Sequence, residues 1–269
     1  MTILDKIVET KKEELTEAKK LFPRSLLLGK PLFHAPKHSV TAAIRSGLTS
    51  GVITEFKRRS PSKGWINEHA SLNEVVRGYA ASGAAAISVL TDAQYFGGSL
   101  TDLQQVRQAV EVPLLRKDFT IDAYQLYEAK ASGADIILLI AAILSPRQVK
   151  ELAAEAHSIG LEVLLEIHDE QELMHVCPEA DLVGINNRNL KNFEVNIEHS
   201  IRLQNMLPGD TIRVAESGIH SVEIAAGLLQ SGFNSLLMGE YFMKQTNPAI
   251  AFASFSKQLK ERLSNHDLQ

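Results

Sequence analysis

The sequence predicts an α/β protein in which eight parallel strands and the helices between them close into a (β/α)8 TIM barrel, preceded by an N-terminal helical extension. Short apolar runs recur at even intervals along the chain. The runs at 136–140 and 163–165 are nearly continuous in Ile, Leu and Val, which is typical of parallel strands buried on both faces. The segments between the runs carry the residues that begin and end helices.

The first 50 residues form the predicted extension. Residues 2–21 place apolar side chains among many Lys and Glu, at the spacing of an amphipathic helix with one apolar stripe. The stripe consists of Ile3, Ile7, Val8, Leu15, Ala18 and Leu21. Residues 22–40 contain Pro23, Pro31 and Pro36 and are predicted to be a connecting loop.

From Gly51 onward a strand-then-helix unit repeats. The apolar runs begin near Gly51, Ala85, Val112, Asp135, Leu161, Asp181, Thr211 and Ser235. Their mean spacing of about 26 residues suits a strand, a helix and two loops. An open doubly wound sheet is the alternative, but no Gly-x-Gly-x-x-Gly follows the first run, so dinucleotide binding loses its main support. Units of even length favour closure of the sheet into a barrel. We therefore expect 1–269 to form a single domain, with 1–50 as its N-terminal helical extension.

Helix boundaries follow from local residue chemistry. Ser71 with Glu74 and Asp169 with Glu172 have the spacing of capping boxes. Ser145 stands before a proline, which is favoured at the first helical position. Four glycines stand just before an apolar run, where a left-handed residue ends a helix. They are Gly83, Gly133, Gly160 and Gly232.

Composition narrows the classes of function. The net charge of −4 argues against a nucleic-acid or membrane surface as the main partner. The N-terminus has no long apolar run, so we expect neither signal peptide nor membrane span, and a cytoplasmic protein. Cys177 is the single cysteine and the nine histidines lack metal-ligand spacing, so no metal or cofactor is expected. We expect a monomer or weak homo-oligomer.

Polar residues cluster where the predicted strands end. In a barrel the carboxyl ends of the strands form the active site, so these side chains converge on one mouth. A single Glu or Lys there is more often half of an ordinary ion pair, whereas two lysines and three glutamates together are typical of an acid–base site. The residues are Glu55, Lys57, Lys117, Glu166, Asn186, Arg188 and Glu216.

Other features of the mouth suit an anionic aromatic substrate. Gly218 and Gly239 follow the last two runs, where loops of barrels often bind phosphate through backbone N–H groups. Residues 57–64 hold four basic side chains, which suggest a nucleic-acid patch or a mobile loop that attracts an anionic small substrate; the net charge favours the loop. Phe96 and Phe119 either stack on an aromatic ring or belong to the core.

Several of these segments together resemble the indole-3-glycerol-phosphate synthases of tryptophan biosynthesis. The matching segments are EFKRRSPSKG at 55–64, LTD at 90–92, YFGGS at 95–99, LRKDF at 115–119, GINNRNL at 184–190 and ESGI at 216–219. They occur in order across every predicted strand, from about Gly51 to Lys244. The resemblance implies a carboxy-lyase without cofactor that closes the indole ring of 1-(2-carboxyphenylamino)-1-deoxyribulose 5-phosphate, with loss of carbon dioxide and water.

The resemblance also implies roles for individual residues. Lys117 matches the general acid and Glu166 the general base, while Lys57 matches a second lysine that pairs with a carboxylate and shares the acid role. Glu55 and Asn186 match residues that orient the sugar hydroxyls and Lys117. The matching substrate-binding residues are Ser60, Phe96, Phe119, Arg188, Leu190, Glu216, Ser217, Gly218, Leu237, Gly239 and Glu240. A lysine beside another lysine is expected to have a lowered pKa, which would suit an acid.

Two alternatives remain. A phosphoribosyl anthranilate isomerase would favour a Cys–Asp acid–base pair, but Cys177 is predicted to lie in a helix-to-strand loop. A non-catalytic phosphosugar-binding barrel would be expected to lose one of Lys57, Lys117 and Glu166, and all three are present.

Overall fold

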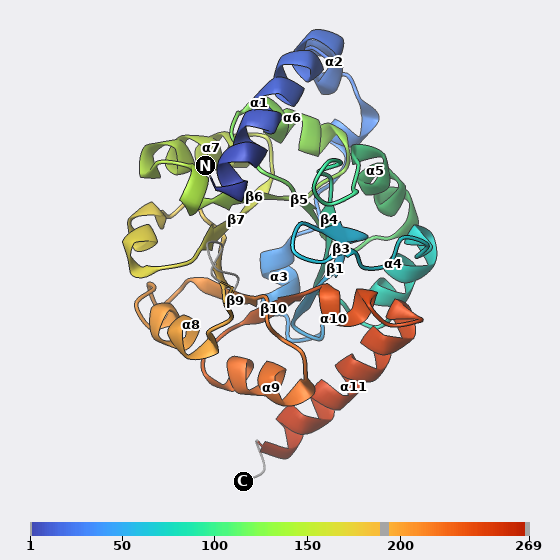
Figure 1. The fold of residues 1–269 in the computed structure, drawn as a ribbon, viewed down its shortest axis with the longest axis vertical. Helices are drawn as coiled ribbons and strands as arrows, with labels where there is room; N and C mark the ends of the chain where they lie inside the picture. Colours follow the sequence, from blue (N-terminus) through green and yellow to red (C-terminus); the bar gives the residue numbers. More distant parts are fainter. Residues whose placement is uncertain (1, 189–193, 267–269) are drawn as a thin grey trace.

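The computed structural model describes residues 2–188 and 194–266 and contains a closed barrel of eight parallel strands surrounded by helices (Figure 1). Each strand is hydrogen-bonded to the next barrel strand along the chain, and the last strand closes on the first. The predicted (β/α)8 barrel is therefore confirmed.

All eight predicted runs begin within two residues of an observed strand. The strands are β1 Val52–Phe56, β4 Ala86–Leu90, β5 Leu114–Lys117, β6 Ile136–Ile140, β7 Glu162–Ile167, β8 Leu182–Asn186, β9 Ile212–Glu216 and β10 Ser235–Met238. The elements between and after them are α4 Leu72–Ala81, α5 Leu100–Ala109, α6 Tyr124–Ala131, η2 Ala141–Ile143, α7 Pro146–Ser158, η3 Glu170–His175, α8 Ile197–Gln204, α9 Val222–Gln230, α10 Glu240–Met243 and α11 Pro248–His266. The unit between β7 and β8 is unusual because its helix, η3, is a 3-10 helix.

Two apolar layers build the core. Side chains of alternate strand positions fill the barrel interior, among them Ile53, Leu115, Leu138 and Leu164. The opposite positions pack against the surrounding helices in a larger cluster. Each such fully buried Leu or Ile stabilises the fold by about 1.5–3 kcal/mol, so the layers fix the barrel that carries the polar strand ends.

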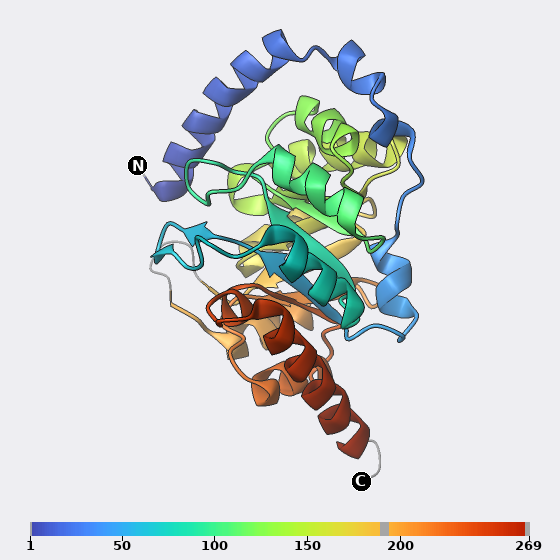
Figure 2. The ribbon, with the colours of Figure 1, turned by 90° about the vertical axis from the view of Figure 1, so that its right-hand side faces the viewer.

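The N-terminal extension runs from one end of the barrel to the other. Its predicted helix is confirmed as α1 Ile3–Leu21, which begins with a capping box between Thr2 and Asp5. The apolar stripe fades toward the end of α1, where Leu21 is 67% exposed. Figure 2 shows α1 near the hairpin that follows β1, and α3 (Val40–Arg45) at the opposite end.

The prediction of a connecting loop at 22–40 is wrong, because this segment contains two short helices. They are α2 Arg24–Leu28 and the 3-10 helix η1 Pro31–His34. Pro23 stands immediately before α2 as its N-cap, and Pro31 is the first residue of η1, the position at which the fixed proline φ favours a helix. The prolines therefore begin helices here instead of preventing them. Beyond η1, Glu162 accepts hydrogen bonds from Ser39 and Thr41, which dock α3 on the start of β7.

The helix-boundary predictions have mixed outcomes. Ser145 caps α7 in a full capping box, whereas Ser71 makes no side-chain capping bond to α4. Asp169 caps η3, but its expected partner Glu172 accepts the backbone N–H of His168 instead of that of Asp169. The helix-ending glycines are confirmed, all with positive φ: Gly83, Gly133, Gly160 and Gly232.

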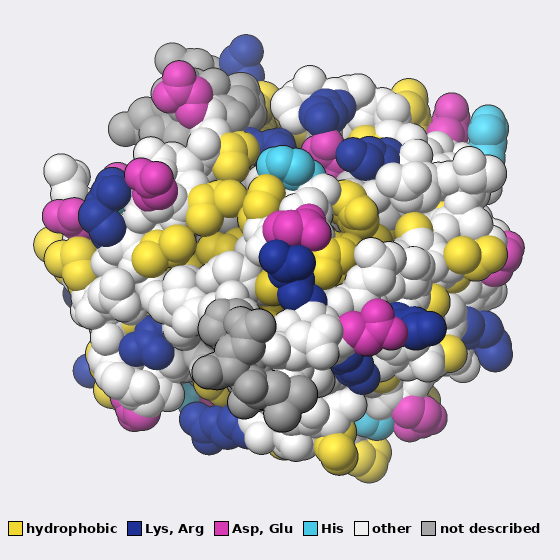
Figure 3. All heavy atoms as spheres, turned by 90° about the horizontal axis from the view of Figure 1, so that it is seen from below, with side chains coloured by type: hydrophobic (Ala, Val, Ile, Leu, Met, Phe, Trp, Pro, Cys, Tyr) yellow, Lys and Arg dark blue, Asp and Glu magenta, His cyan; other side chains and the backbone are white. Residues whose placement is uncertain are grey.

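The basic segment at 57–64 belongs to a small antiparallel hairpin, which was not predicted. Its strands are β2 Arg59–Ser60 and β3 Gly64–Trp65, and Arg58 anchors it through an ion pair with Asp102 at 2.8 Å. Figure 3 shows one face of the molecule, on which basic and acidic side chains are interspersed. No helix within the described ranges is long and apolar enough to cross a bilayer.

Candidate active site

A cavity of about 550 Å³ opens at the carboxyl ends of the strands. Fifteen of the sixteen predicted site residues line it, and the sixteenth, Leu190, lies outside the described residues. Those fifteen are Glu55, Lys57, Ser60, Phe96, Lys117, Phe119, Glu166, Asn186, Arg188, Glu216, Ser217, Gly218, Leu237, Gly239 and Glu240. Parallel register explains the convergence, since Asn186 is paired with Glu216, and Glu166 stands beside Gly184.

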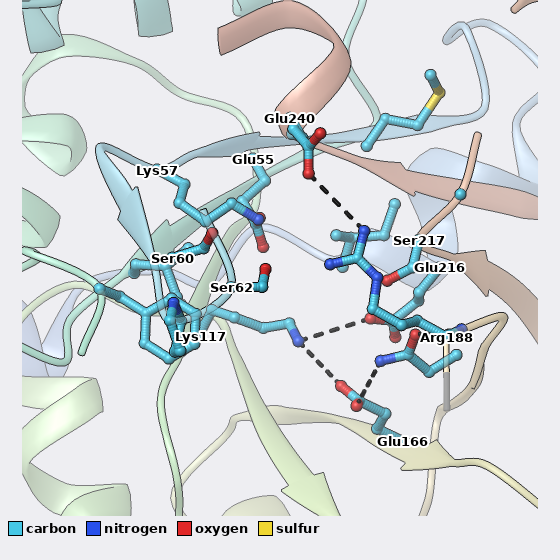
Figure 4. Close-up of a pocket in the computed structure, with 18 of the residues that line it drawn as sticks. Glu55, Lys57, Ser60, Ser62, Lys117, Glu166, Arg188, Glu216, Ser217 and Glu240 are labelled. Carbon is cyan, nitrogen blue, oxygen red and sulfur yellow. Dashed lines mark hydrogen bonds and ion pairs between the residues drawn. The ribbon is translucent and has the colours of Figure 1, made fainter. Parts of the chain in front are cut away.

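Lys117 lies at the centre of the site. Its Nζ is 2.9 Å from Oε2 of Glu166 and 3.5 Å from Oε2 of Glu216 (Figure 4). Burial works to lower the pKa of Lys117, but Glu166, Glu216 and Glu55 outweigh it and raise that pKa above its ordinary value. The expectation that a neighbouring lysine lowers this pKa is therefore wrong, because three carboxylates dominate the surroundings.

Glu166 is buried and held at both carboxylate oxygens. Oε2 faces Lys117, and Oε1 accepts a hydrogen bond from Asn186 at 3.0 Å. Burial alone would raise the pKa of Glu166, but Lys117, His168 and Asn186 hold it well below its usual range. The carboxylate is ionised at neutral pH and can accept a proton once Lys117 moves away.

Glu216 is buried beside Lys117 but is poorly compensated. Its Oε1 has no hydrogen-bond partner among the described residues. Burial, together with repulsion from Glu166 and Glu55, raises the pKa of Glu216 to about 7, against the attraction of Lys117. A Cβ at Gly184 would lie only 2.1 Å from Glu216 Oε1, so a side chain there would displace the Glu216 carboxylate. The mouth thus holds one carboxyl group with a lowered pKa, Glu166, and one with a raised pKa, Glu216. Such a difference between neighbouring carboxyl groups is typical of acid–base sites.

Lys57 is the second lysine of the mouth. Its Nζ lies 2.6 Å from Oε1 of Glu55, which confirms that it pairs with a carboxylate. Ser88 donates to the other oxygen of Glu55 at 3.4 Å. The two lysines therefore face different carboxylates.

One end of the cavity has the backbone geometry of an anion site. Ser217, with φ 67°, is the one non-glycine residue of positive φ in the described chain, and Gly218 follows with φ 69°. Such strained backbone concentrates at functional sites. A side chain at Gly218 would also collide with Val195, whose Cγ1 would lie 2.3 Å from the added Cβ. Above this end, Glu240 bridges Lys63 at 2.5 Å and Arg188 at 3.8 Å.

The other end is apolar. The rings of Phe96 and Phe119 lie 6.0 Å apart between centroids. The α1 helix adds Ile3, Leu4 and Ile7, which were not predicted as site residues. The apolar stripe of α1 was visible in the sequence, but the surface that it covers was not.

A buried lysine, also unpredicted, anchors α1 beside the mouth. Lys11 Nζ lies 3.0 Å from Asp118 Oδ1, 3.2 Å from Asp92 Oδ2 and 2.6 Å from Glu14 Oε2. Attraction by Asp118, Glu14 and Asp92 outweighs the burial that would lower the pKa of Lys11, and raises it. The anchor joins the extension directly to the segment that carries Lys117.

Comparisons with known sequences place the chain in a family. The sequence model described as indole-3-glycerol phosphate synthase matches residues 4–255. The indole-3-glycerol phosphate synthase of Bacteroides thetaiotaomicron is 51% identical over 211 residues, which cover 78% of this chain and 81% of that protein. The one of Albidiferax ferrireducens is 42% identical over 255 residues, which cover 93% of this chain and 97% of that protein.

Solved structures that resemble the chain share its fold at low identity. Thiamine phosphate pyrophosphorylase from Pyrococcus furiosus has a TM-score of 0.60 at 18% identity, covering 82% of this chain and 99% of its own. The 3-hexulose-6-phosphate synthase from Salmonella typhimurium has a TM-score of 0.62 at 12% identity, covering 78% and 98%. These structures support the barrel alone.

Proposed function

Since the chain belongs to the indole-3-glycerol phosphate synthase family, we propose that Lys117 and Glu166 are the acid and the base of its reaction. The chain is a carboxy-lyase of tryptophan biosynthesis. It converts 1-(2-carboxyphenylamino)-1-deoxyribulose 5-phosphate to indole-3-glycerol phosphate, carbon dioxide and water. The observation that carries the proposal is the Lys117–Glu166 ion pair buried at the centre of the cavity.

The reaction needs two proton donations and one proton acceptor beside the substrate. The ring carbon that bears the carboxylate attacks the ketone carbon, and the carbonyl electron pair takes a proton from Lys117. Carbon dioxide then leaves, and its bonding electrons return to the ring. Loss of the new hydroxyl as water takes a second proton from an acid, while a carbon-bound proton passes to Glu166. The proton on Glu166 balances the one used in the dehydration, and Lys117 regains from solvent the proton that it gave to the carbonyl. One proton is therefore consumed per turnover, which matches the carboxylate charge lost as carbon dioxide.

The protonation states suit these roles. Lys117 keeps its proton at neutral pH because its neighbours are anions, and its contact with developing negative charge on oxygen would ease proton transfer. Glu166 is ionised and ready to accept. Lys57, held by Glu55, is the second donor of the site and shares the acid role.

The remaining residues are assigned to binding. We place the phosphate at the end formed by Ser217, Gly218, Gly239, Glu240 and Ser60, where the backbone is strained. We place the anthranilate ring at the apolar end, between Phe96, Phe119 and Leu237. In this orientation Asn186, Arg188 and Glu216 face the sugar chain between the two ends. Apolar walls around the carboxylate would favour its loss as neutral carbon dioxide.

The proposal extends to the setting of the enzyme. The chain binds a phosphorylated small molecule and no nucleic acid. It acts in the cytoplasm as a monomer or weak homo-oligomer. The net charge of −4 supports a small anionic substrate drawn in by local basic residues over a polyanion bound across the surface.

Indole fluorescence tests the proposal directly. Purified protein is mixed with the carboxyphenylamino-deoxyribulose phosphate substrate, alongside Lys117→Met, Glu166→Gln and the control Lys12→Met, a lysine exposed on α1. We expect product fluorescence with the wild type and the control, and a loss of about 10²–10⁴-fold in kcat for the two site variants. Folded Lys117→Met or Glu166→Gln protein with the kcat of the wild type would refute the assignment of acid and base, and a folded wild type that binds the substrate without product formation would refute the reaction.

A further inference from the structure

A buried histidine stands behind the proposed base, outside the substrate cavity. His168 follows β7, two residues after Glu166, and its side chain is 10% exposed. Its Nε2 lies 3.2 Å from Glu166 Oε1, and its Nδ1 lies 3.2 Å from Glu172 Oε2. Each ring nitrogen therefore faces a different carboxylate.

This arrangement fixes the charge of the ring. Only the imidazolium form carries a proton on both nitrogens and can interact favourably with both carboxylates. Burial would lower the pKa of His168, but Glu166 and Glu172 outweigh it and raise that pKa to about 10. The Nε2 contact is an ion pair and not an aligned hydrogen bond. His168 thus acts on Glu166 mainly through its positive charge.

The ring is held on the side away from Glu166. Glu172 also accepts the backbone N–H of His168 at 2.6 Å, so one carboxylate fixes both the ring and the backbone. The carbonyl oxygen of His168 accepts a hydrogen bond from His199 Nε2, on α8, at 3.1 Å. These contacts keep the imidazolium in position when the side chains around it move.

We propose that His168 is a positioning residue for the reaction: its fixed positive charge holds Glu166 in place and ionised while Lys117 turns toward the substrate. The inference rests on the proposed role of Glu166 as the base. Lys117 cannot both donate to substrate oxygen and remain on Glu166 Oε2. When it leaves, Glu166 stays buried beside the like charge of Glu216, and His168 is the cation that remains next to it.

The charged groups around this pair define the expected pH effect. Glu166 interacts with Lys117 of β5, with Glu216 of β9 and with His168, which follows its own strand. Glu55 of β1 acts on Lys117 and Glu216. His168 in addition faces Glu172 of η3, and its backbone carbonyl contacts His199 of α8. Without the imidazolium, burial and the neighbouring carboxylates would raise the pKa of Glu166. The acid limb of kcat/KM would then move to higher pH.

The test compares His168→Asn and His168→Gln, which keep a polar side chain without the charge, with Glu172→Gln and with His157→Asn. His157 is a more exposed histidine paired with Asp181, so it is the matched control. We expect both His168 variants to lower kcat about tenfold with KM within twofold, and to shift the acid limb by at least one pH unit. Glu172→Gln should shift it in the same direction by less, and His157→Asn not at all.

A second readout does not depend on turnover. In ¹⁵N spectra of histidine-labelled protein, the His168 ring should remain an imidazolium to about pH 9 in the wild type and lose its proton at lower pH in Glu166→Gln. Wild-type kcat and an unmoved acid limb in folded His168 variants would overturn the inference, as would a neutral ring at pH 7. An inactive wild type would instead remove the proposed function itself, and the role of His168 with it.

Discussion

Two clusters of buried charge meet at the end of β5, and they differ in how completely their charges are paired. The mouth cluster consists of Glu55, Lys57, Lys117, Glu166 and Glu216 and faces the cavity. The anchor cluster consists of Lys11, Asp92, Arg116, Asp118 and Glu128 and joins α1, β5 and α6. Lys117 and Asp118 are neighbours in the chain, yet each belongs to a different cluster.

A carboxylate from each cluster illustrates the contrast. Asp118 faces Arg116 at 3.1 Å and Lys11 at 3.0 Å, and it accepts the hydroxyl of Thr91 at 2.6 Å. Burial would raise the pKa of Asp118, but these partners hold it well below its usual range. Glu216 is equally buried, has one lysine at 3.5 Å, and has a pKa raised to about 7. Burial alone therefore does not decide ionisation; the set of partners does.

The contrast has a functional meaning. Close pairing of Asp118 with two cations in the anchor cluster stabilises one arrangement of the N-terminal helix. Incomplete pairing in the mouth cluster keeps protons available near neutral pH, at a cost in stability. Variants at the two clusters should therefore separate activity from stability.

The largest effect is expected from Lys117→Met, with its neighbour Arg116→Met as the comparison. Lys117→Met removes the proposed acid, so kcat/KM should fall by about 10³-fold or more, since general acid catalysis contributes on this scale. Arg116→Met should instead lower the melting temperature and leave the activity of the folded fraction within about tenfold. Calorimetry measures the melting temperature, and the fluorescence assay measures kcat/KM. Equal activity losses in both variants would contradict the division between clusters.

Asp118→Asn should produce the largest change in stability. The pKa of Asp118 is lowered on folding, so its stabilisation is present above the unfolded pKa, near 3.8, and is lost as pH falls through the folded value. Removing the charge leaves Arg116 and Lys11 poorly compensated and should cost about 3–5 kcal/mol at pH 7. Urea unfolding at pH 7 and at about pH 3 measures this cost, because the stabilisation begins to be lost only below the unfolded pKa. A cost that does not shrink at the lower pH would argue against charge pairing as its source.

Glu216→Gln should act in the opposite direction. An acid whose pKa is raised on folding destabilises the fold once the unfolded chain has lost its proton. The penalty is therefore absent below pH about 4.5 and complete above about 7. The variant should be more stable than the wild type by about 2–3 kcal/mol at pH 8 and little changed at pH 4.5. Destabilisation at pH 8 would show that Lys117 compensates Glu216 more fully than we infer.

The smallest effect is expected from Lys11→Met, which breaks the link between the anchor cluster and α1. The loss should be local, since Asp118 keeps Arg116, and we expect about 1–2 kcal/mol from incomplete pairing of Asp92 and Asp118. KM should rise severalfold because α1 supplies Ile3, Leu4 and Ile7 to the cavity. Hydrogen exchange along α1 measures the local opening. Lys12→Met, on the exposed face, should change stability by less than about 0.5 kcal/mol; an equal effect would refute the anchor.

The sequence by itself determined the periodic parts of this protein. Apolar runs such as 136–140 place strands to within two residues, because a strand buried on both faces must be apolar throughout. Helix-ending glycines were visible for a similarly local reason, since their left-handed conformation is costly for other residues. The polar strand ends predicted the residues that line the mouth, because parallel strands bring their carboxyl ends together.

Only the tertiary structure decided which charges face one another. Lys11 and Asp118 are 107 residues apart, and their contact depends on where α1 lies across the barrel. His168 had no recognisable signal, because its role depends on two carboxylates brought to opposite sides of one ring by β7 and η3. The pKa of Lys117 was misjudged for the same reason. Electrostatic interactions depend on distance and burial in three dimensions, whereas periodicity and propensity act between near neighbours along the chain.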